Sequence, residues 1–181
     1  MSWRAGAWNH GGSAFDEVLR VPLVITMPGA AGAGLRIEEV TRHIDVMPTL
    51  LDLAGVEPPG GIQGRSLRPL VEGGSMDDPV PAYAEVFPIR PAGCEIVSLV
   101  TPPHKIIRVS LDGVTDVMLF DIAADPGELD NIVSALSDIY EGLLSDVDVW
   151  DGVARLYTPE TDAVPLDPGT LKKLKSLGYI N

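Results

Sequence analysis

Four short extended runs follow one another so closely that no crossover helix fits between them. They are rich in β-branched residues and occupy residues 83–87, 95–101, 104–111 and 116–122. Asp112-Gly113 provides a turn signal between the last two runs. Because parallel strands need connections of a dozen or more residues, this spacing predicts a four-stranded antiparallel sheet.

An amphipathic helix is predicted directly after this sheet. Apolar residues at helical spacing form one stripe, made of Ile132, Leu136, Ile139, Leu143, Val147 and Trp150. We expect the stripe to pack on the sheet, which gives this half of the chain an α+β character. A Lys-rich helix is predicted near the end, where Leu171, Leu174 and Leu177 alternate with Lys172, Lys173 and Lys175.

The first part of the chain has a different pattern. Residues 13–19 predict a short helix with Ser13 as its N-cap. The run Val21–Met27 is almost entirely apolar and ends at Pro28-Gly29, as expected of a strand covered on both faces of an α/β sheet. Such a strand needs neighbours on both sides. We therefore expect residues 1–75 to be the end of a larger α/β domain.

A second helix in this part is predicted to begin at Asp45. Asp45 is a suitable N-cap, Pro48 lies in the tolerated first turn, and the helix stops near Gly55. Its apolar face consists of Val46, Met47, Leu50, Leu51 and Ala54. Residues 57–78 are rich in Gly and Pro and are interpreted as a connection. The fold class is therefore α/β, a partial sheet followed by a subdomain over residues 76–181.

Composition excludes several classes of function. A net charge of −13 and a pI near 4.4 argue against nucleic-acid binding, which requires clustered Lys and Arg. Cys94 is the only cysteine, so no intrachain disulfide can form. No apolar run approaches the roughly 20 residues that span a bilayer. The chain is expected to be soluble, and cytoplasmic if Met1 is its true start.

Several phrases of the sequence resemble the sulfatase family of the alkaline phosphatase superfamily, in the order that the family has them. They are HGGSAFDEVLRVPLVITMPG (10–29), HIDVMPTLLDLAGVEPP (43–59), GIQGRSLRPLVEG (61–73), AYAEVF (82–87), LFDIAADPGELDNIV (119–133) and LKSLGYI (174–180). Their order across nearly the whole chain indicates the carboxy-terminal portion of such an enzyme.

The resemblance implies chemistry that depends on residues outside this chain. The family uses a cysteine of a Cys/Ser-X-Pro-X-Arg motif, converted to formylglycine, and a divalent cation, usually calcium. Cys94 lies in AGCEIVS, which lacks the Pro and the Arg. We therefore expect no catalytic residue, no metal ligand and no cofactor within this chain, and inactivity without the missing amino-terminal half.

The sequence is compatible with three functions. The first is a part in the hydrolysis of a small-molecule sulfate ester. The second is hydrolysis of phosphodiesters or phosphonates, since the superfamily's sites differ mainly in nucleophile and anion contacts. The third is a noncatalytic, degenerate module that completes another chain.

The resemblance also implies one candidate for substrate binding, His10. It lies close to where the family places a His or Lys that contacts the sulfate or phosphate group, although a shift of one residue would match Gly11 instead. Arg20 is expected to form a structural ion pair with Asp16 or Glu17. His104 and Lys105 could present a substrate contact, but a solvated strand end is the favoured interpretation.

The remaining polar candidates have structural interpretations. His43 is expected to serve the helix terminus or packing, and Asp52 to lie on the solvent face. Asp121, Asp125, Glu128 and Asp130 lack the spacing of a calcium loop, so a turn and a helix start explain them.

Overall fold

The structure is a computed structural model that describes residues 12–30, 32–78, 80–86, 94–135, 137–156 and 167–176. The chain divides into two compact units, Met1–Trp150 and Asp151–Asn181. His10 lies outside the described residues, and the proposed boundary between residues 75 and 76 stays a prediction.

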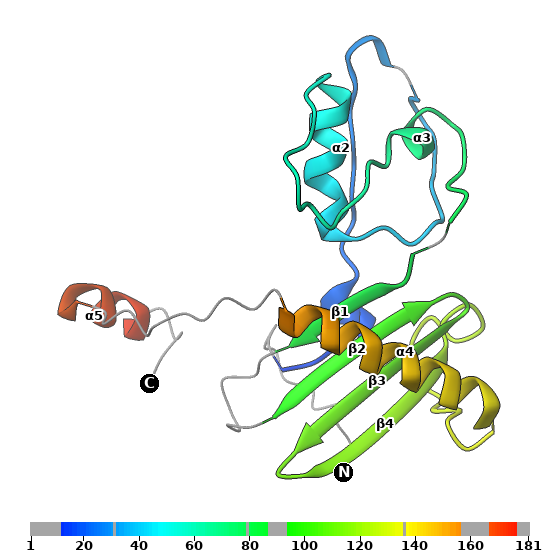
Figure 1. Cartoon of the computed structure of the whole chain (residues 1–181), viewed down its shortest axis with the longest axis vertical. Coiled ribbons are helices and arrows are strands. Elements are labelled where there is room, and N and C mark those ends of the chain that lie inside the picture. Colours follow the sequence, from blue (N-terminus) through cyan, green and yellow to red (C-terminus); the bar gives the residue numbers. More distant parts are fainter. Residues whose placement is uncertain are drawn as a thin grey trace. The chain divides into compact units, whose positions relative to one another are not determined.

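A four-stranded antiparallel sheet forms the centre of the first unit (Figure 1). Its strands lie in chain order and are β1 (Ala82–Val86), β2 (Glu95–Thr101), β3 (His104–Leu111) and β4 (Val114–Asp121). Asp112 and Gly113 connect β3 to β4 with φ angles of 51° and 78°, the left-handed conformation that tight hairpins require. The predicted sheet is confirmed.

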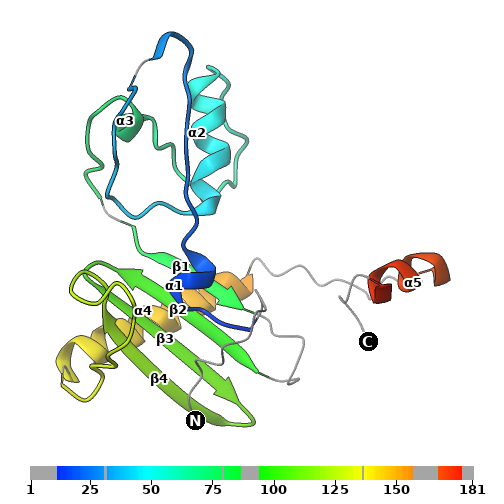
Figure 2. The ribbon, with the colours of Figure 1, turned by 180° about the vertical axis from the view of Figure 1, so that it is seen from behind.

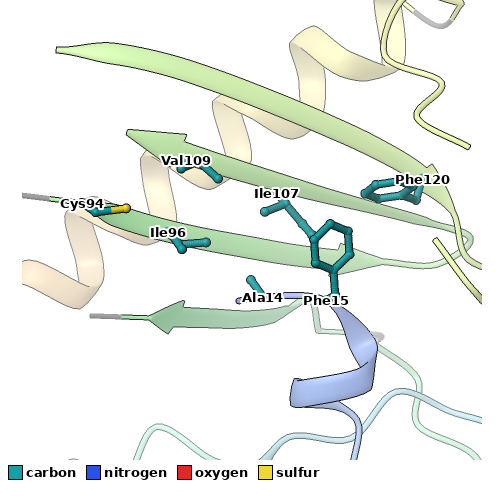
Figure 3. Packing of buried hydrophobic residues seen from close by; sticks show 7 residues of the cluster. All are labelled: Ala14, Phe15, Cys94, Ile96, Ile107, Val109 and Phe120. Carbon is teal, nitrogen blue, oxygen red and sulfur yellow. The ribbon is translucent and has the colours of Figure 1, made fainter. Parts of the chain in front are cut away.

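Both faces of this sheet are covered. On one face, Phe15 from the segment before helix α1 (Asp16–Leu19) packs among sheet residues, and its ring lies 5.9 Å from that of Phe120 (Figure 3). The other face is covered by α4 (Ser137–Leu156) (Figures 1 and 2). Leu143 and Val147 of α4 belong to one buried cluster with residues of β2, β3 and β4. The sheet is thus the middle layer of three.

Helix α4 begins later than the sequence predicts. Ile132 lies in a loop, and its backbone N–H donates to Leu119 O at 2.8 Å. The side chain of Asn131 accepts hydrogen bonds from the N–H groups of Leu119 and Val133, so the loop is fastened to β4 before the helix starts. Ile132 still packs against the α4 layer, whereas Ile139 is exposed. Leu136 lies outside the described residues.

Residues 21–27 do not form the predicted strand. They are extended and follow α1 directly, but no backbone hydrogen bond joins them to any other described residue. Val24 is 84% exposed. The physical reason is that extended chain becomes a strand only through a hydrogen-bonded neighbour. The described part of the chain offers these residues none.

Residues 28–78 form a small lobe with little regular structure (Figure 1). Its elements are the short 3-10 helices η1 (Pro28–Ala30) and η2 (His43–Asp45), helix α2 (Val46–Leu53) and the one-turn helix α3 (Arg68–Val71). The connection predicted over residues 57–78 is therefore irregular, apart from α3. Leu70 and Val71 of α3 are buried.

The carboxylate of Asp45 holds this lobe together. It is fully buried and accepts hydrogen bonds from Arg42 Nη2 at 2.7 Å, Arg42 Nε at 3.0 Å and the backbone N–H of Arg65 at 3.0 Å. Gly64 passes so close to Ile44 O that any larger residue would clash with it. Asp45 occupies the N-cap position as predicted, but its side chain does not cap α2. It anchors residues 64–65 instead.

Helix α2 presents its apolar face to the outside, contrary to expectation. Its buried positions are Pro48 and Thr49. The Thr49 hydroxyl donates to Asp45 O at 2.5 Å and accepts from the N–H of Leu67 at 2.8 Å. Met47 and Leu50, from the predicted core face, are 54% and 56% exposed. Polar bonds to the 64–67 segment therefore decide which side of α2 is buried.

Besides the last residues of α4, the second unit contains the described helix α5 (Pro168–Ser176), in the region predicted from its leucines and lysines. Asp167 caps it by accepting hydrogen bonds from the N–H groups of Gly169 and Thr170 at 2.9 and 3.1 Å. Leu177 lies outside the described residues. Within the described ranges, no helix combines the length and apolarity needed to cross a membrane.

Asp45→Asn should loosen the lobe in a pH-dependent way. Burial raises the pKa of Asp45, but the hydrogen bonds from Arg42 and Arg65 outweigh it and hold the pKa below its ordinary value of 3.8. A lowered pKa means that the charged carboxylate stabilises the fold at neutral pH and stops doing so as pH falls through the folded-state pKa. We expect a loss of about 3 kcal/mol at pH 7.

Hydrogen exchange of the α2 amides measures this local stability. The α2 amides should be less protected from exchange in Asp45→Asn than in the wild type. This difference in protection should be largest at pH 7 and should shrink below about pH 4. Asp116→Asn, at an exposed position of β4, is the matched control. A difference that stays constant down to pH 3 would contradict the role given to Asp45.

Candidate functional site

A fully buried lysine lies on the sheet face that α1 covers. Lys105 is the second residue of β3, and the strand period places it on the same face as the core residues Ile107 and Val109. Its exposed fraction is 0%. A lysine in such a position requires charged partners, because an isolated buried ammonium is strongly unfavourable.

Two carboxylates from distant parts of the chain supply these partners. Lys105 Nζ lies 2.6 Å from Asp16 Oδ1 and 2.6 Å from Glu128 Oε1. The second oxygen of Glu128 accepts the backbone N–H of Asp16 at 2.7 Å, at the start of α1. We call Lys105, Asp16 and Glu128 the charged triad. It joins α1, β3 and the loop after β4 at one point.

The loop after β4 is shaped to bring Glu128 inward. Asp121 Oδ1 accepts the N–H groups of Ala123 and Ala124, and Asp125 Oδ2 accepts those of Leu129 and Asp130. Glu128 itself has a φ of +50°, an unfavourable conformation for a residue with a side chain. The turn predicted from this acidic cluster explains Asp121 and Asp125, whereas Glu128 has a separate role in the charged triad.

A hollow of about 290 Å³ lies beside the charged triad. It is lined by Phe15, Asp16, Glu17, Arg20, Pro126, Gly127 and Glu128. Arg20 is exposed there, and its predicted ion pair with Asp16 or Glu17 is wrong, because Asp16 bonds to Lys105 instead. The exposed guanidinium is a suitable group for meeting an anion.

A larger hollow, of about 630 Å³, lies between α2 and the Gly- and Pro-rich loop after it. The ionisable side chains that line it are Asp52 and Glu57. Asp52 accepts hydrogen bonds from Ser66 Oγ at 2.6 Å and Arg68 Nη1 at 3.2 Å, and the bond from Ser66 is the main reason that its pKa is lowered. No Lys, Arg or His side chain is among the residues that line this hollow, whereas Arg20 lines the smaller one, so the larger hollow is the poorer candidate for binding an anion.

The structure places most of the residues that the sequence suggested for a site outside the charged triad, and Lys105 within it. Lys105 is neither a substrate contact nor a solvated strand end, because its ammonium is buried between two carboxylates. His104 is half-buried at the start of β3, opposite Thr101 and Asp121. His43 is exposed at the start of η2, and its carbonyl accepts the N–H of Val46. The role of His10 stays a prediction.

Sequence comparison assigns the chain to a family. Residues 7–146 match the model of the family described as N-sulphoglucosamine sulphohydrolase, C-terminal. This chain belongs to that sulfatase family. N-acetylglucosamine-6-O-sulfatase of Bacteroides thetaiotaomicron is 33% identical over 65% of the chain and 22% of its own length. Arylsulfatase K of Danio rerio is 34% identical over 72% of the chain and 25% of its own length.

Two solved structures share the fold over part of their length. A protein in complex with its substrate D-glucosamine-2-N,6-O-disulfate matches 65% of the chain and 25% of its own chain, with a TM-score of 0.54 and 27% identity. The phosphonate monoester hydrolase of Agrobacterium radiobacter matches 76% of this sulfatase chain and 31% of its own, with a TM-score of 0.53 and 25% identity. The chain thus spans about a quarter of the length of these curated relatives.

The described residues do not fit the cofactors that a complete sulfatase implies. Among them, no three His, Cys, Asp or Glu side chains converge in a way that could hold a metal ion. Cys94 packs in the apolar cluster that also contains Ala14 and Phe15, near Ile96, and is only 6% exposed (Figure 3). A thiol among Ile96, Val109 and their neighbours is a core residue, not an oxidised nucleophile. No step of catalysis is therefore assigned to a metal or formylglycine in this chain.

Lys105→Met should strongly destabilise the first unit. Methionine retains much of the apolar stem but leaves the carboxylates of Asp16 and Glu128 without their cation. Breaking a buried ion pair by removing one partner costs about 3–5 kcal/mol. Urea unfolding followed by far-UV circular dichroism measures the loss.

Two further variants make this test specific. Lys105→Met combined with Glu128→Gln should recover part of the lost stability, because one uncompensated charge is gone. Lys175→Met, on an exposed position of α5, is the matched control and should change little. A loss below about 1 kcal/mol for Lys105→Met would show that the charged triad does not stabilise the fold.

Proposed function

We propose that this chain is the carboxy-terminal part of a sulfuric ester hydrolase and contributes to the wall of its substrate pocket. The nucleophile and the ligands of the cation then come from residues that the chain does not contain. The observation that carries the proposal is the family match over residues 7–146, combined with a chain that spans only 22% and 25% of the length of two relatives. In this arrangement the chain forms one wall of the substrate pocket, and the missing amino-terminal portion completes it.

Within the pocket, His10 is proposed to contact the ester's anionic group. It lies six residues before Asp16 of the charged triad, so the triad limits how far this segment can move from the sheet. Arg20, exposed at the hollow, lies on the other side of α1 in sequence and can add attraction for the anion. A histidine or arginine that bonds an oxyanion contributes about 1.5–3 kcal/mol when charged.

The substrate proposed is a sulfated glucosamine. Three comparisons support this class by their names: the family is called N-sulphoglucosamine sulphohydrolase, a relative is an N-acetylglucosamine-6-O-sulfatase, and a solved neighbour holds D-glucosamine-2-N,6-O-disulfate. Calcium and formylglycine would be supplied by the rest of the enzyme.

A second candidate is phosphonate or phosphodiester hydrolysis. The phosphonate monoester hydrolase structure matches 76% of the chain, compared with 65% for the protein bound to the disulfated sugar. The two activities handle anions of similar size and tetrahedral shape. A direct comparison of substrates on one protein therefore separates them.

The test joins this chain to the amino-terminal part of the Bacteroides thetaiotaomicron N-acetylglucosamine-6-O-sulfatase, supplies calcium, and compares glucosamine-6-sulfate with an aryl phosphonate. We expect at least tenfold higher kcat/KM for the sulfate ester. His10→Ala should lower kcat/KM by about ten- to a hundredfold, the equivalent of one charge-assisted hydrogen bond. His43→Ala, an exposed histidine of the lobe, is the control and should leave kcat/KM unchanged.

Each outcome decides between the candidates. Faster turnover of the phosphonate would favour the second candidate. No turnover of either substrate would favour the noncatalytic module. Equal activity of His10→Ala and His43→Ala would remove His10 from the pocket.

A further inference from the structure

The lysines of the chain are concentrated in helix α5. The sequence contains four lysines, and three of them, Lys172, Lys173 and Lys175, lie within four residues of this helix. The fourth, Lys105, is buried in the charged triad. Residues 168–181 contain no acidic side chain, although Asp and Glu outnumber Lys and Arg by 26 to 13 in the whole chain. The sequence around α5 is therefore cationic within an acidic protein.

The three ammonium groups of α5 have no partner among the described residues. All three lysines are exposed, and within the described ranges none of their side chains forms a hydrogen bond or an ion pair. The nearest acidic residue in the sequence, Asp167, is engaged at the other end of the helix, where it accepts the N–H groups of Gly169 and Thr170. The three charges are thus available to an external anion.

The helix gathers these charges on one side. Lys172 and Lys175 are three residues apart and are therefore neighbours along the helix surface, and Lys173 lies beside Lys172. At 3.6 residues per turn, the three positions occupy about 160° of the circumference. Leu171 and Leu174 fall on the remaining side. The sequence LKKLKS therefore gives a helix with one cationic side, which we call the lysine face.

The stability of the helix accounts for only part of this charge. Lys173 and Lys175 lie in the last turn, where cations are favourable at the negative end of the helix dipole. Lys172 lies before that turn and gains less from the dipole. A ligand that carries several negative charges accounts for all three lysines. Short segments rich in Lys or Arg commonly bind polyanions such as nucleic acids or heparin.

The chemistry of α5 favours a sulfated polysaccharide among the polyanions. Nucleic-acid sites combine cations with aromatic or arginine side chains on which bases stack, and α5 contains neither. Helices that lie on anionic membranes bury a broad apolar face, whereas α5 offers Leu174, which is half-buried, and Leu171, which is 37% exposed. Lysines are point charges on flexible stems, so they can follow sulfate groups of variable spacing.

We propose that the lysine face binds the sulfate groups of a sulfated polysaccharide that contains glucosamine. The choice of sugar rests on the substrate class proposed above, whereas the binding itself requires no turnover. The acidic remainder of the chain does not prevent this contact, because at 0.1 M salt charges more than about 10 Å apart are largely screened. In this arrangement α5 holds a polymer, whereas the pocket accepts one sulfated residue of it.

The experiment measures binding of the whole chain to fluorescein-labelled heparin, a polymer of sulfated glucosamine and uronic acid, by fluorescence anisotropy. Each lysine contact with a flexible polyanion contributes about −0.7 to the slope of log affinity against log salt concentration. We therefore expect a slope of about −2, or roughly a fifteenfold loss of affinity between about 50 and 200 mM sodium chloride. Unsulfated hyaluronan should compete poorly, because it lacks the sulfate groups.

Substitutions in α5 locate the contact. Replacing Lys172, Lys173 and Lys175 together by Gln, which has a similar helix propensity, should lower the affinity for heparin at least about tenfold. Replacing all three by Arg should retain binding. Lys172→Gln should weaken binding about fivefold while keeping both cations of the last turn, so it separates binding from helix stability. Arg36→Gln, at an exposed position of the lobe, is the matched control and should change nothing.

Three results would overturn the proposal. These are equal affinity of the triple Gln variant and the wild type, binding of double-stranded DNA as tight as that of heparin at equal phosphate and sulfate concentration, and binding to phosphatidylserine vesicles without binding to heparin. A chain that binds heparin through α5 while the fusion turns over neither ester would keep this inference and contradict the proposed hydrolase function. Turnover of glucosamine-6-sulfate without heparin binding would do the reverse.

Discussion

The ammonium of Lys105 is the point at which distant parts of the first unit are joined. It takes one carboxylate from α1 and one from the loop after β4, and it is fully buried between them. Without it, α1 would be held to the sheet mainly by the packing of Ala14 and Phe15. The position of α1, and of residues 21–27 that follow it, therefore depends on this cation. A buried charge of this kind is tolerated only because both carboxylates remain paired with it.

The sheet and the lobe differ in the kind of side chain that they bury. The sheet buries apolar side chains on both of its faces, against the segment around Phe15 and against α4. The lobe is centred on a polar anchor, Asp45, and leaves its apolar stripe on α2 outside. That arrangement is unfavourable for a domain that works alone. It is the arrangement expected of a surface that another part of a protein covers.

The sequence predicted local structure well where local chemistry determines it. β2 and β3 have the predicted bounds, because β-branched alternation and the Asp112-Gly113 turn specify them without outside help. Residues 21–27 have the composition of a strand but no neighbour among the described residues, so composition alone was insufficient.

The buried side of α2 was missed because buried bonds of Asp45 and Thr49, not hydrophobicity, decide its orientation. The charged triad joins residues 89 apart, which no short-range pattern reveals. One signal was present: the strand period puts Lys105 on the same face as Ile107 and Val109.

The central claim is that this chain frames a sulfatase pocket while the cation site belongs to residues outside it. Calorimetric titration of the purified chain with calcium chloride tests this claim most directly. If the cation site lies outside this chain, calcium should bind only weakly to the acidic surface, and the heats of binding should be small and should decrease with added salt. Saturable binding of one calcium ion per chain, with a dissociation constant of about 10 µM or less, as in dedicated protein sites, would contradict it.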